Sequence, residues 1–209
     1  VNSTVELVKE KKVRAPANFI NGILRNIIRN KYNLLKIPIE FTNLPSWFKK
    51  RVLWTEKQKK YFLTTIRQEP SLHLVFKNKK FVKNFNCDFI QTTSCSIAMK
   101  NKNLIENIKD YNKGIWWVQD LSVMMPIHSL NNIKNNNVAD LCAAPGGKSF
   151  QLITKGAVVT VFEKNPKRAR LMEQNFQRLN LDYKIVIKDV LKVDIRQKFD
   201  IVILDSPCS

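Results

Sequence analysis

Short apolar segments alternate with helical segments between residues 138 and 209, an alternation typical of a parallel β-sheet. Four strands are predicted there, ending at Asp140 with the loop CAAPGGK, at Glu163, at Asp189, and at Asp205 with Cys208. Such sheets have both faces covered and bind ligands at the carboxyl ends of their strands. Helix capping explains one aspartate after a strand equally well. Because all four predicted strands end at such residues, a binding site at this edge of the sheet is favoured over helix capping alone.

The loop CAAPGGKS at residues 142–149 narrows the class of ligand. Gly146 and Gly147 let the backbone approach a ligand closely, and a helix that starts here presents its amides. A phosphate-binding P-loop requires a glycine where Cys142 stands, and Pro145 removes one of the N–H groups that a phosphate needs. The dinucleotide motif G-x-G-x-x-G is missing as well. Both common phosphate-binding loops are therefore disfavoured.

Carboxylates at the next two strand ends suit a nucleoside. Glu163, 16 residues after Gly147, can accept hydrogen bonds from two ribose hydroxyls, as an acidic residue does in dinucleotide folds. Asp189 can accept a hydrogen bond from the exocyclic amine of an adenine. With the phosphate-binding loops disfavoured, S-adenosylmethionine is the remaining common nucleoside cofactor.

The charge of the chain points to a polyanionic partner. Lysine and arginine number 36 against 17 aspartates and glutamates, a net charge of +19. Residues 1–114 carry +15 of this charge and residues 115–209 carry +4. An AT-rich genome explains part of the total, but it does not explain the concentration in one part of the chain. The distribution favours an RNA- or DNA-docking region joined to a near-neutral region.

Composition disfavours several other classes of protein. No apolar run reaches the roughly 18 residues that a membrane span needs, and the first residues lack the apolar core of a signal peptide. The four cysteines show no CxxC pairing, which argues against a disulfide scaffold or a zinc ribbon, so no metal site is expected. These features predict a cytoplasmic protein with no membrane partner.

The motifs DLCAAPGGKS and DSPCS resemble those of the RNA cytosine-5 methyltransferases, and among them the RsmB/Sun (Fmu) type, which modifies 16S ribosomal RNA. Similar segments are NFINGILRN (18–26), LPSWF (44–48) and WVQDLS (117–122). The resemblance implies a fold of the α/β class, with three parts. They are the end of an all-α NusB-like domain (1–36), a basic linker with an α+β RNA-recognition subdomain (37–114), and an incomplete Rossmann-like S-adenosylmethionine-dependent methyltransferase domain (115–209). It also implies a monomer that acts on 16S ribosomal RNA before the subunit is fully assembled.

The resemblance also assigns the site. The residues that it implies bind S-adenosylmethionine or border it are Cys142, Ala143, Ala144, Pro145, Gly146, Gly147, Lys148, Glu163, Asp189 and Asp205. In the family, the residues matching Lys148 and Asp205 also face the target base, so both are candidate catalytic residues. Glu163 stands where the family often has aspartate, and it preserves the charge with a longer reach.

Cysteine suits the chemistry that this family performs. C5 of cytosine is a poor nucleophile, and thiolate addition at C6 makes the base enamine-like, so that C5 can attack a methyl sulfonium. The resemblance implies that Cys208 assists product release and that the nucleophilic cysteine lies in a Thr-Cys motif beyond Ser209. The apolar last strand has no helix after it, and Val1 begins close to a helix. We therefore expect a chain cut at both ends, without a complete active site.

Periodicity predicts further elements before residue 138. Helices are expected at 2–12, 17–30, 45–54, 56–67 and 94–109, strands at 72–76 and 115–120, and a linker across 31–48. The strand at 115–120 is expected to open the catalytic unit. The four tryptophans are expected to pack in cores rather than to stack on bases.

Two other functions remain open. A transfer-RNA cytosine-5 methyltransferase can carry the same loop. A non-catalytic RNA-binding or assembly protein can keep the fold and lose the chemistry. A Thr-Cys motif downstream in the full-length gene would favour the enzyme over the binding protein.

Overall fold

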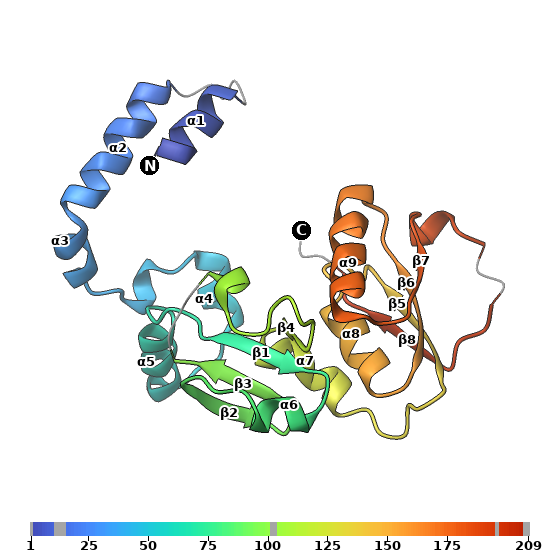
Figure 1. Ribbon diagram of the computed structural model, residues 1–209. Helices are drawn as coiled ribbons and strands as arrows, with labels where there is room; N and C mark the ends of the chain where they lie inside the picture. Colours follow the sequence, from blue (N-terminus) through green and yellow to red (C-terminus); the bar gives the residue numbers. More distant parts are fainter. Residues whose placement is uncertain (1, 11–15, 101–103, 195–196, 207–209) are drawn as a thin grey trace. The chain divides into compact units, whose positions relative to one another are not determined.

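The computed structural model describes residues 2–10, 16–100, 104–194 and 197–206 (Figure 1). Contacts divide the chain into two compact units, Val1–Glu69 and Pro70–Ser209. In the described residues, no helix combines the length and the apolar character that a membrane crossing needs.

The first unit is helical. Its elements are α1 (Asn2–Glu10), α2 (Ala17–Arg29), α3 (Lys31–Lys36), the 3-10 helix η1 (Phe41–Asn43), α4 (Ser46–Arg51) and α5 (Glu56–Thr65). The helices predicted at 17–30, 45–54 and 56–67 are present as α2, α4 and α5. The prediction of a linker across 31–48 is wrong in part, because α3 occupies its first six residues. The segment KYNLLK contains no proline or glycine, and Pro38 follows only after α3 has ended.

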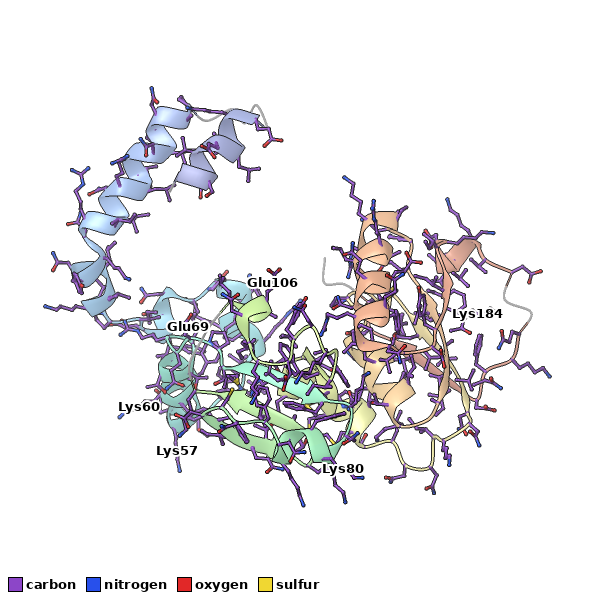
Figure 2. The ribbon with its side chains drawn as sticks, in the orientation of Figure 1. Lys57, Lys60, Glu69, Lys80, Glu106 and Lys184 are labelled. Carbon is purple, nitrogen blue, oxygen red and sulfur yellow. The ribbon has the colours of Figure 1, made fainter. Side chains whose placement is uncertain are left out.

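Aromatic rings hold α4 and α5 together. Phe48 lies 5.5 Å from Phe62 and 5.6 Å from Trp54 between ring centroids, and Trp54 lies 5.0 Å from Phe62. Trp54 therefore packs as the sequence predicts, whereas Trp47 is 60% exposed, against the prediction. Lys57 and Lys60 project outward from α5 in Figure 2.

The second unit begins with an antiparallel sheet. Its elements are β1 (Leu72–Phe76), α6 (Lys79–Lys83), β2 (Phe89–Thr93), β3 (Ser96–Met99), η2 (Ile105–Asn107) and β4 (Trp116–Val118), and the strand order is β2-β3-β1-β4. The helix predicted at 94–109 is wrong, because residues 96–99 form β3 between β2 and β1. Ile97 and Met99 alternate with the less buried Ala98, a period that suits a strand. The pairing with β1 decides the outcome, and it cannot be read from the local pattern.

The strand predicted at 115–120 forms as β4, but it does not open the parallel sheet. It pairs with β1 through Val75 and Trp117 and forms the edge of the antiparallel sheet. Trp116 and Trp117 are buried, as the sequence predicts for these tryptophans. The helix α7 (Leu121–His128), which the sequence analysis does not predict, follows directly and leads to the parallel sheet.

The parallel sheet carries the predicted α/β pattern. Its elements are β5 (Asn137–Leu141), α8 (Gly147–Thr154), β6 (Val158–Phe162), α9 (Pro166–Leu179), β7 (Lys184–Val186), η3 (Val190–Lys192) and β8 (Ile201–Leu204), in the strand order β7-β6-β5-β8. The predicted α/β class with a parallel sheet is therefore confirmed. Figure 1 shows α8 and α9 on the same side of this sheet.

Covering of both faces of the sheet, predicted from the apolar strands, is observed at β6, where four consecutive residues are buried, but not at β8 in the described residues. Along β8, Ile201 and Ile203 pack against the core that the helices cover. Val202 and Leu204, which point to the opposite face, are 57% and 65% exposed. Helices of the described residues thus cover one face of the sheet at this strand.

The two sheets are connected by the side chain of Arg178 from α9. Its Nη1 donates to the backbone oxygens of Tyr111, at 3.0 Å, and Trp116, at 3.1 Å. The guanidinium also lies 4.3 Å from the centroid of the Tyr111 ring, a cation–π geometry. These contacts satisfy backbone carbonyls beside β4 and attach the antiparallel sheet to the parallel one.

Candidate functional site

The loop between β5 and α8 is shaped by two left-handed residues. Cys142 has a φ of 62° and Gly146 a φ of 105°, and together they turn the chain from the strand into the helix. A Cβ at Gly146 would lie 2.5 Å from the ring of Phe150, so the space at this position suits glycine and is too small for a side chain. The backbone N–H of Phe150 donates to Gly146 O at 2.8 Å as α8 begins.

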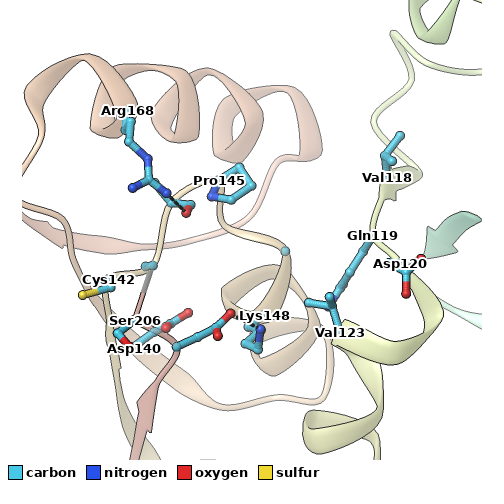
Figure 3. Close-up of a pocket in the computed structure, with 14 residues that line it drawn as sticks. Val118, Gln119, Asp120, Val123, Asp140, Cys142, Pro145, Lys148, Arg168 and Ser206 are labelled. Carbon is cyan, nitrogen blue, oxygen red and sulfur yellow. Dashed lines mark hydrogen bonds and ion pairs between the residues drawn. The ribbon is translucent and has the colours of Figure 1, made fainter. Parts of the chain in front are cut away.

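A cavity of about 500 Å³ opens over this loop (Figure 3). The predicted site residues that line it are Cys142, Ala143, Ala144, Pro145, Gly147, Lys148 and Asp205. Gly146 does not line this cavity, and its positive φ lets the chain turn from β5 into α8. Figure 3 places Val118 of β4, Val123 of α7, and Gln119 from the segment between them across the cavity from Asp140 and Lys148.

A second cavity of about 290 Å³ lies beside the first and shares Cys142, Arg168 and Ser206 with it. Glu163 and Asp189 line this second cavity. The structure thus brings the predicted residues of β5, β6, β7 and β8 to one edge of the parallel sheet. The two cavities together offer an elongated site along the strand ends.

Glu163 directly follows β6 and is 3% exposed. One of its two carboxylate oxygens has no hydrogen-bond partner in the described residues. Its Oε1 accepts a hydrogen bond from the backbone N–H of Asn165 at 2.9 Å. Its Oε2 has no hydrogen-bond partner in the described part of the chain, and the nearest cation, Nη1 of Arg168, is 3.9 Å away. A buried carboxylate oxygen without a hydrogen bond is costly. Its position in the second cavity suits a ligand that donates a hydrogen bond.

Asp189 lies three residues beyond the end of β7, which is shorter than the predicted strand. Its side chain caps η3 by accepting from the backbone N–H of Leu191 at 3.1 Å. The capping explanation that the sequence leaves open for single aspartates therefore applies here. Asp189 still lines the second cavity, and its second oxygen can accept another hydrogen bond.

Lys148 and Asp205 form an ion pair across the first cavity. Nζ of Lys148, whose side chain is 13% exposed, contacts Oδ2 of Asp205, whose side chain is 62% exposed. Asp205 directly follows β8, and Lys148 is the second residue of α8. Neighbouring strands of a parallel sheet, β5 and β8, bring the two charges together although they are 57 residues apart.

Asp140 lies beneath this pair and is 1% exposed. Burial raises its pKa from 3.8 to about 6, with a smaller raising effect from Asp205. The hydrogen bond from Ser149 Oγ, at 2.5 Å, and the charge of Lys148 oppose this rise in the pKa. Asp140 is a buried charge whose cost is partly offset by these two partners.

We expect the Asp140→Asn variant to gain stability relative to wild type at pH 8 and to lose part of that gain at pH 5. The folded-state pKa is raised, so the folded state takes up a proton as pH falls through about 6, before the unfolded state does near 3.8. Wild type therefore recovers about 1 to 2 kcal/mol between pH 8 and pH 5 that the variant cannot recover. Urea unfolding of both proteins at the two pH values measures this difference. A pH-independent difference would contradict the burial of a charged Asp140.

Arg168 and Gln119 are among the cavity residues that the sequence analysis misses. Arg168 lines both cavities and donates from Nη2 to Ala144 O at 2.5 Å, so it braces the loop. Gln119 lines the first cavity from the segment between β4 and α7. Arg168 is one of several basic residues in its helix, and Gln119 lies far from the loop in sequence. The sequence alone offers no signal that singles out either residue.

Cys208, predicted to assist product release, lies outside the described residues. The chain is described up to Ser206, which lines both cavities just after Asp205.

Residues 127–209 match the sequence profile of the family described as 16S rRNA methyltransferase RsmB/F. A ribosomal RNA small subunit methyltransferase B from Shewanella oneidensis is 25% identical over 100% of this chain and 53% of that protein. A tRNA (cytosine(72)-C(5))-methyltransferase from Pyrococcus horikoshii is 32% identical over 50% of this chain and 28% of that protein.

Among solved structures, a methyltransferase homolog protein from Pyrococcus horikoshii superposes with a TM-score of 0.67. It is 22% identical and covers 80% of this chain and 60% of that chain, so it supports the fold. The chain spans about half the length of the ribosomal RNA relative and a smaller share of the transfer RNA relative.

Proposed function

We propose that the chain belongs to the RsmB/F family of S-adenosylmethionine-dependent RNA methyltransferases, and that it serves the methylation of C5 of a cytosine in 16S ribosomal RNA. The observation that carries this proposal is the pair of cavities at the strand ends. The glycine loop borders one cavity, and Glu163, whose Oε2 has no hydrogen-bond partner in the described residues, lines the other, which suits a nucleoside with two ribose hydroxyls.

The residues divide between cofactor and base. Glu163 accepts hydrogen bonds from the ribose, and Asp189 accepts one from the adenine amine. The loop backbone from Cys142 to Lys148 surrounds the remaining part of the cofactor, which supplies an electrophilic methyl group when bound. The Lys148–Asp205 pair borders the same cavity and is placed to orient a cytosine by hydrogen bonds.

Cytosine C5 methylation needs a thiolate. A cysteine sulfur adds to C6, C5 takes the methyl group, and a base removes the C5 proton so that the C6–S bond breaks and the thiolate leaves. We assign the product-release role to Cys208, and we assign the addition step to a cysteine of a Thr-Cys motif beyond Ser209. Asp205, three residues before Cys208 in the sequence, pairs with Lys148 at the first cavity.

The RNA contacts are assigned to the basic part of the chain, with a NusB-like segment at 1–36 and an RNA-recognition part at 37–114. The relative whose match covers all of this chain is named for ribosomal RNA, whereas the transfer RNA relative matches half of it. This favours 16S ribosomal RNA as the substrate. We further propose that the protein is a cytoplasmic monomer that acts before the subunit is fully assembled.

Bisulfite sequencing of ribosomal and transfer RNA from cells with and without the gene tests the substrate. We expect one cytosine of 16S ribosomal RNA to lose its protection when the gene is deleted. Loss at a transfer RNA position instead would favour the transfer RNA enzyme. Unchanged methylation in both RNAs would favour the non-catalytic RNA-binding protein.

Calorimetric titration with S-adenosylhomocysteine tests the cofactor site. We expect Asp205→Ala to weaken binding by about tenfold, because the variant removes the partner of a charged lysine that lines the cavity. Asp182→Ala is the matched control, since Asp182 is exposed and lines neither cavity. No binding by the folded full-length protein would contradict the proposed cofactor site.

A further inference from the structure

Three buried side chains link the antiparallel sheet to the helix that carries Lys148. Trp117 on β4 donates from Nε1 to Oε1 of Gln119 at 2.8 Å, and Nε2 of Gln119 donates to Oε1 of Gln151 on α8 at 3.2 Å. Nε2 of Gln151 then donates to the backbone oxygen of Met124 on α7 at 3.0 Å. The three side chains belong to residues that are at most 6% exposed. We call this chain of hydrogen bonds the amide relay.

The two ends of the amide relay set its direction. The indole of Trp117 can only donate a hydrogen bond, and the backbone oxygen of Met124 can only accept one. Flipping the amide of Gln119 or Gln151 would therefore place donor against donor or acceptor against acceptor. Because the site is buried, water cannot repair such a mismatch cheaply. The relay thus holds each amide in one orientation.

Gln119 also touches the first residue of α8. A Cβ built on Gly147 would lie 3.2 Å from Cδ of Gln119 and 3.4 Å from its Oε1, so the amide lies directly over the glycine backbone. Gln119, Gly147 and Lys148 all line the first cavity. Gln151 does not line it and reaches it only through Gln119.

We propose that Gln119 is a positioning residue. The amide relay holds the first turn of α8, which begins with Gly147 and Lys148, in place for the cofactor and couples this turn to the antiparallel sheet. This inference rests on the proposed function, which assigns the first cavity to S-adenosylmethionine. Trp117 belongs to the sheet to which RNA contacts are assigned, and Lys148 borders the base and cofactor. A change at Trp117 in the sheet therefore reaches α8 through two hydrogen bonds, from Trp117 to Gln119 and from Gln119 to Gln151.

Binding of S-adenosylhomocysteine to three relay variants tests the positioning role. We expect Gln119→Met to weaken binding by about tenfold, the effect of one misplaced buried hydrogen-bonding group. Gln151→Met should weaken binding as well, although Gln151 does not line the cavity. The double variant should bind no more weakly than Gln119→Met alone, because either change already breaks the relay.

Lys155→Met is the matched structural control. Lys155 directly follows α8, and its Nζ donates to the backbone oxygens of Ile127, His128 and Leu130, at 2.8, 3.2 and 2.7 Å, so it connects the end of α8 to the end of α7. Lys155 lines neither cavity. We expect this variant to lower the melting temperature but to bind S-adenosylhomocysteine within about twofold of wild type. An equal loss of affinity in Lys155→Met, or wild-type affinity in Gln119→Met, would overturn the relay.

Hydrogen exchange without any ligand separates this inference from the proposed function. We expect the amides of residues 143–150 to exchange faster in both glutamine variants than in wild type or in Lys155→Met. If wild type binds no S-adenosylhomocysteine, the proposed cofactor is wrong, and the exchange rates still decide whether the relay holds the turn. Unchanged exchange at residues 143–150 in both glutamine variants would overturn it.

Discussion

Replacing Gly114 with alanine is expected to destabilise the Pro70–Ser209 unit by more than about 3 kcal/mol, the range in which a clash inside a packed structure combines with backbone strain. A Cβ at this position would lie 1.8 Å from the backbone oxygen of Arg178 and 2.7 Å from its carbonyl carbon. Both atoms are backbone of α9, so they cannot move aside by a change of rotamer. Gly114 also has a φ of 60°, which disfavours any side chain.

Urea unfolding followed by tryptophan fluorescence measures this loss, since Trp116 and Trp117 lie beside Gly114 in the sequence and are buried. Gly22→Ala is the matched control, because a Cβ there meets nothing within 4 Å and the residue lies inside α2. The control should be neutral or stabilising by up to about 1 kcal/mol. If the Gly114 variant unfolds at the same urea concentration as wild type, the close approach of this loop to α9 is wrong.

Replacing Glu163 with glutamine is expected to weaken binding of S-adenosylhomocysteine by about 10- to 100-fold. The variant keeps the size of the side chain but removes the negative charge, and hydrogen bonds to charged groups are stronger than neutral ones. The free protein should lose little stability or gain some, because Oε2 of Glu163 is buried without a hydrogen bond in the described residues. Affinity and stability should therefore change in opposite directions.

Calorimetry for the affinity and thermal melting for the stability separate these two effects. Asp182→Asn serves as the control for removing one negative charge from an exposed position. A Glu163→Gln protein that binds S-adenosylhomocysteine as tightly as wild type would contradict the proposal that Glu163 accepts hydrogen bonds from the ribose. A variant that is strongly destabilised would instead assign Glu163 a structural role through its hydrogen bond from Asn165.

The parallel sheet and its site could be predicted from the sequence because the local pattern of each strand agrees with the place of that strand in the folded sheet. Buried parallel strands are apolar throughout, and each one ends at the same edge of the sheet. The ends of β6 and β8 therefore place Glu163 and Asp205 at that edge without any knowledge of the packing. The glycines of the loop carry a conformational requirement that is equally local, as the φ of Gly146 shows.

The antiparallel sheet was less predictable, since its strands are short and their partners are distant in sequence. Residues 96–99 were predicted as part of a helix, yet they pair with β1 some 20 residues earlier. The strand β4 was expected to open the catalytic unit, yet its register with β1 places it in the antiparallel sheet. Strand pairing of this kind depends on the partner surface more than on intrinsic preference.

The sequence by itself determined the α/β class, the cofactor loop and the polar strand ends. Hydrophobic periodicity, the backbone freedom of glycine and side-chain charge each depend on residues that are close together in the sequence. Only the tertiary structure decided the amide relay, the contact of Arg168 with Ala144 and the spare oxygen of Glu163. Gln119 and Gln151 are 32 residues apart, and each is an ordinary polar residue in its own segment. Burial makes their hydrogen bonds consequential, and burial is a property of the whole packed unit.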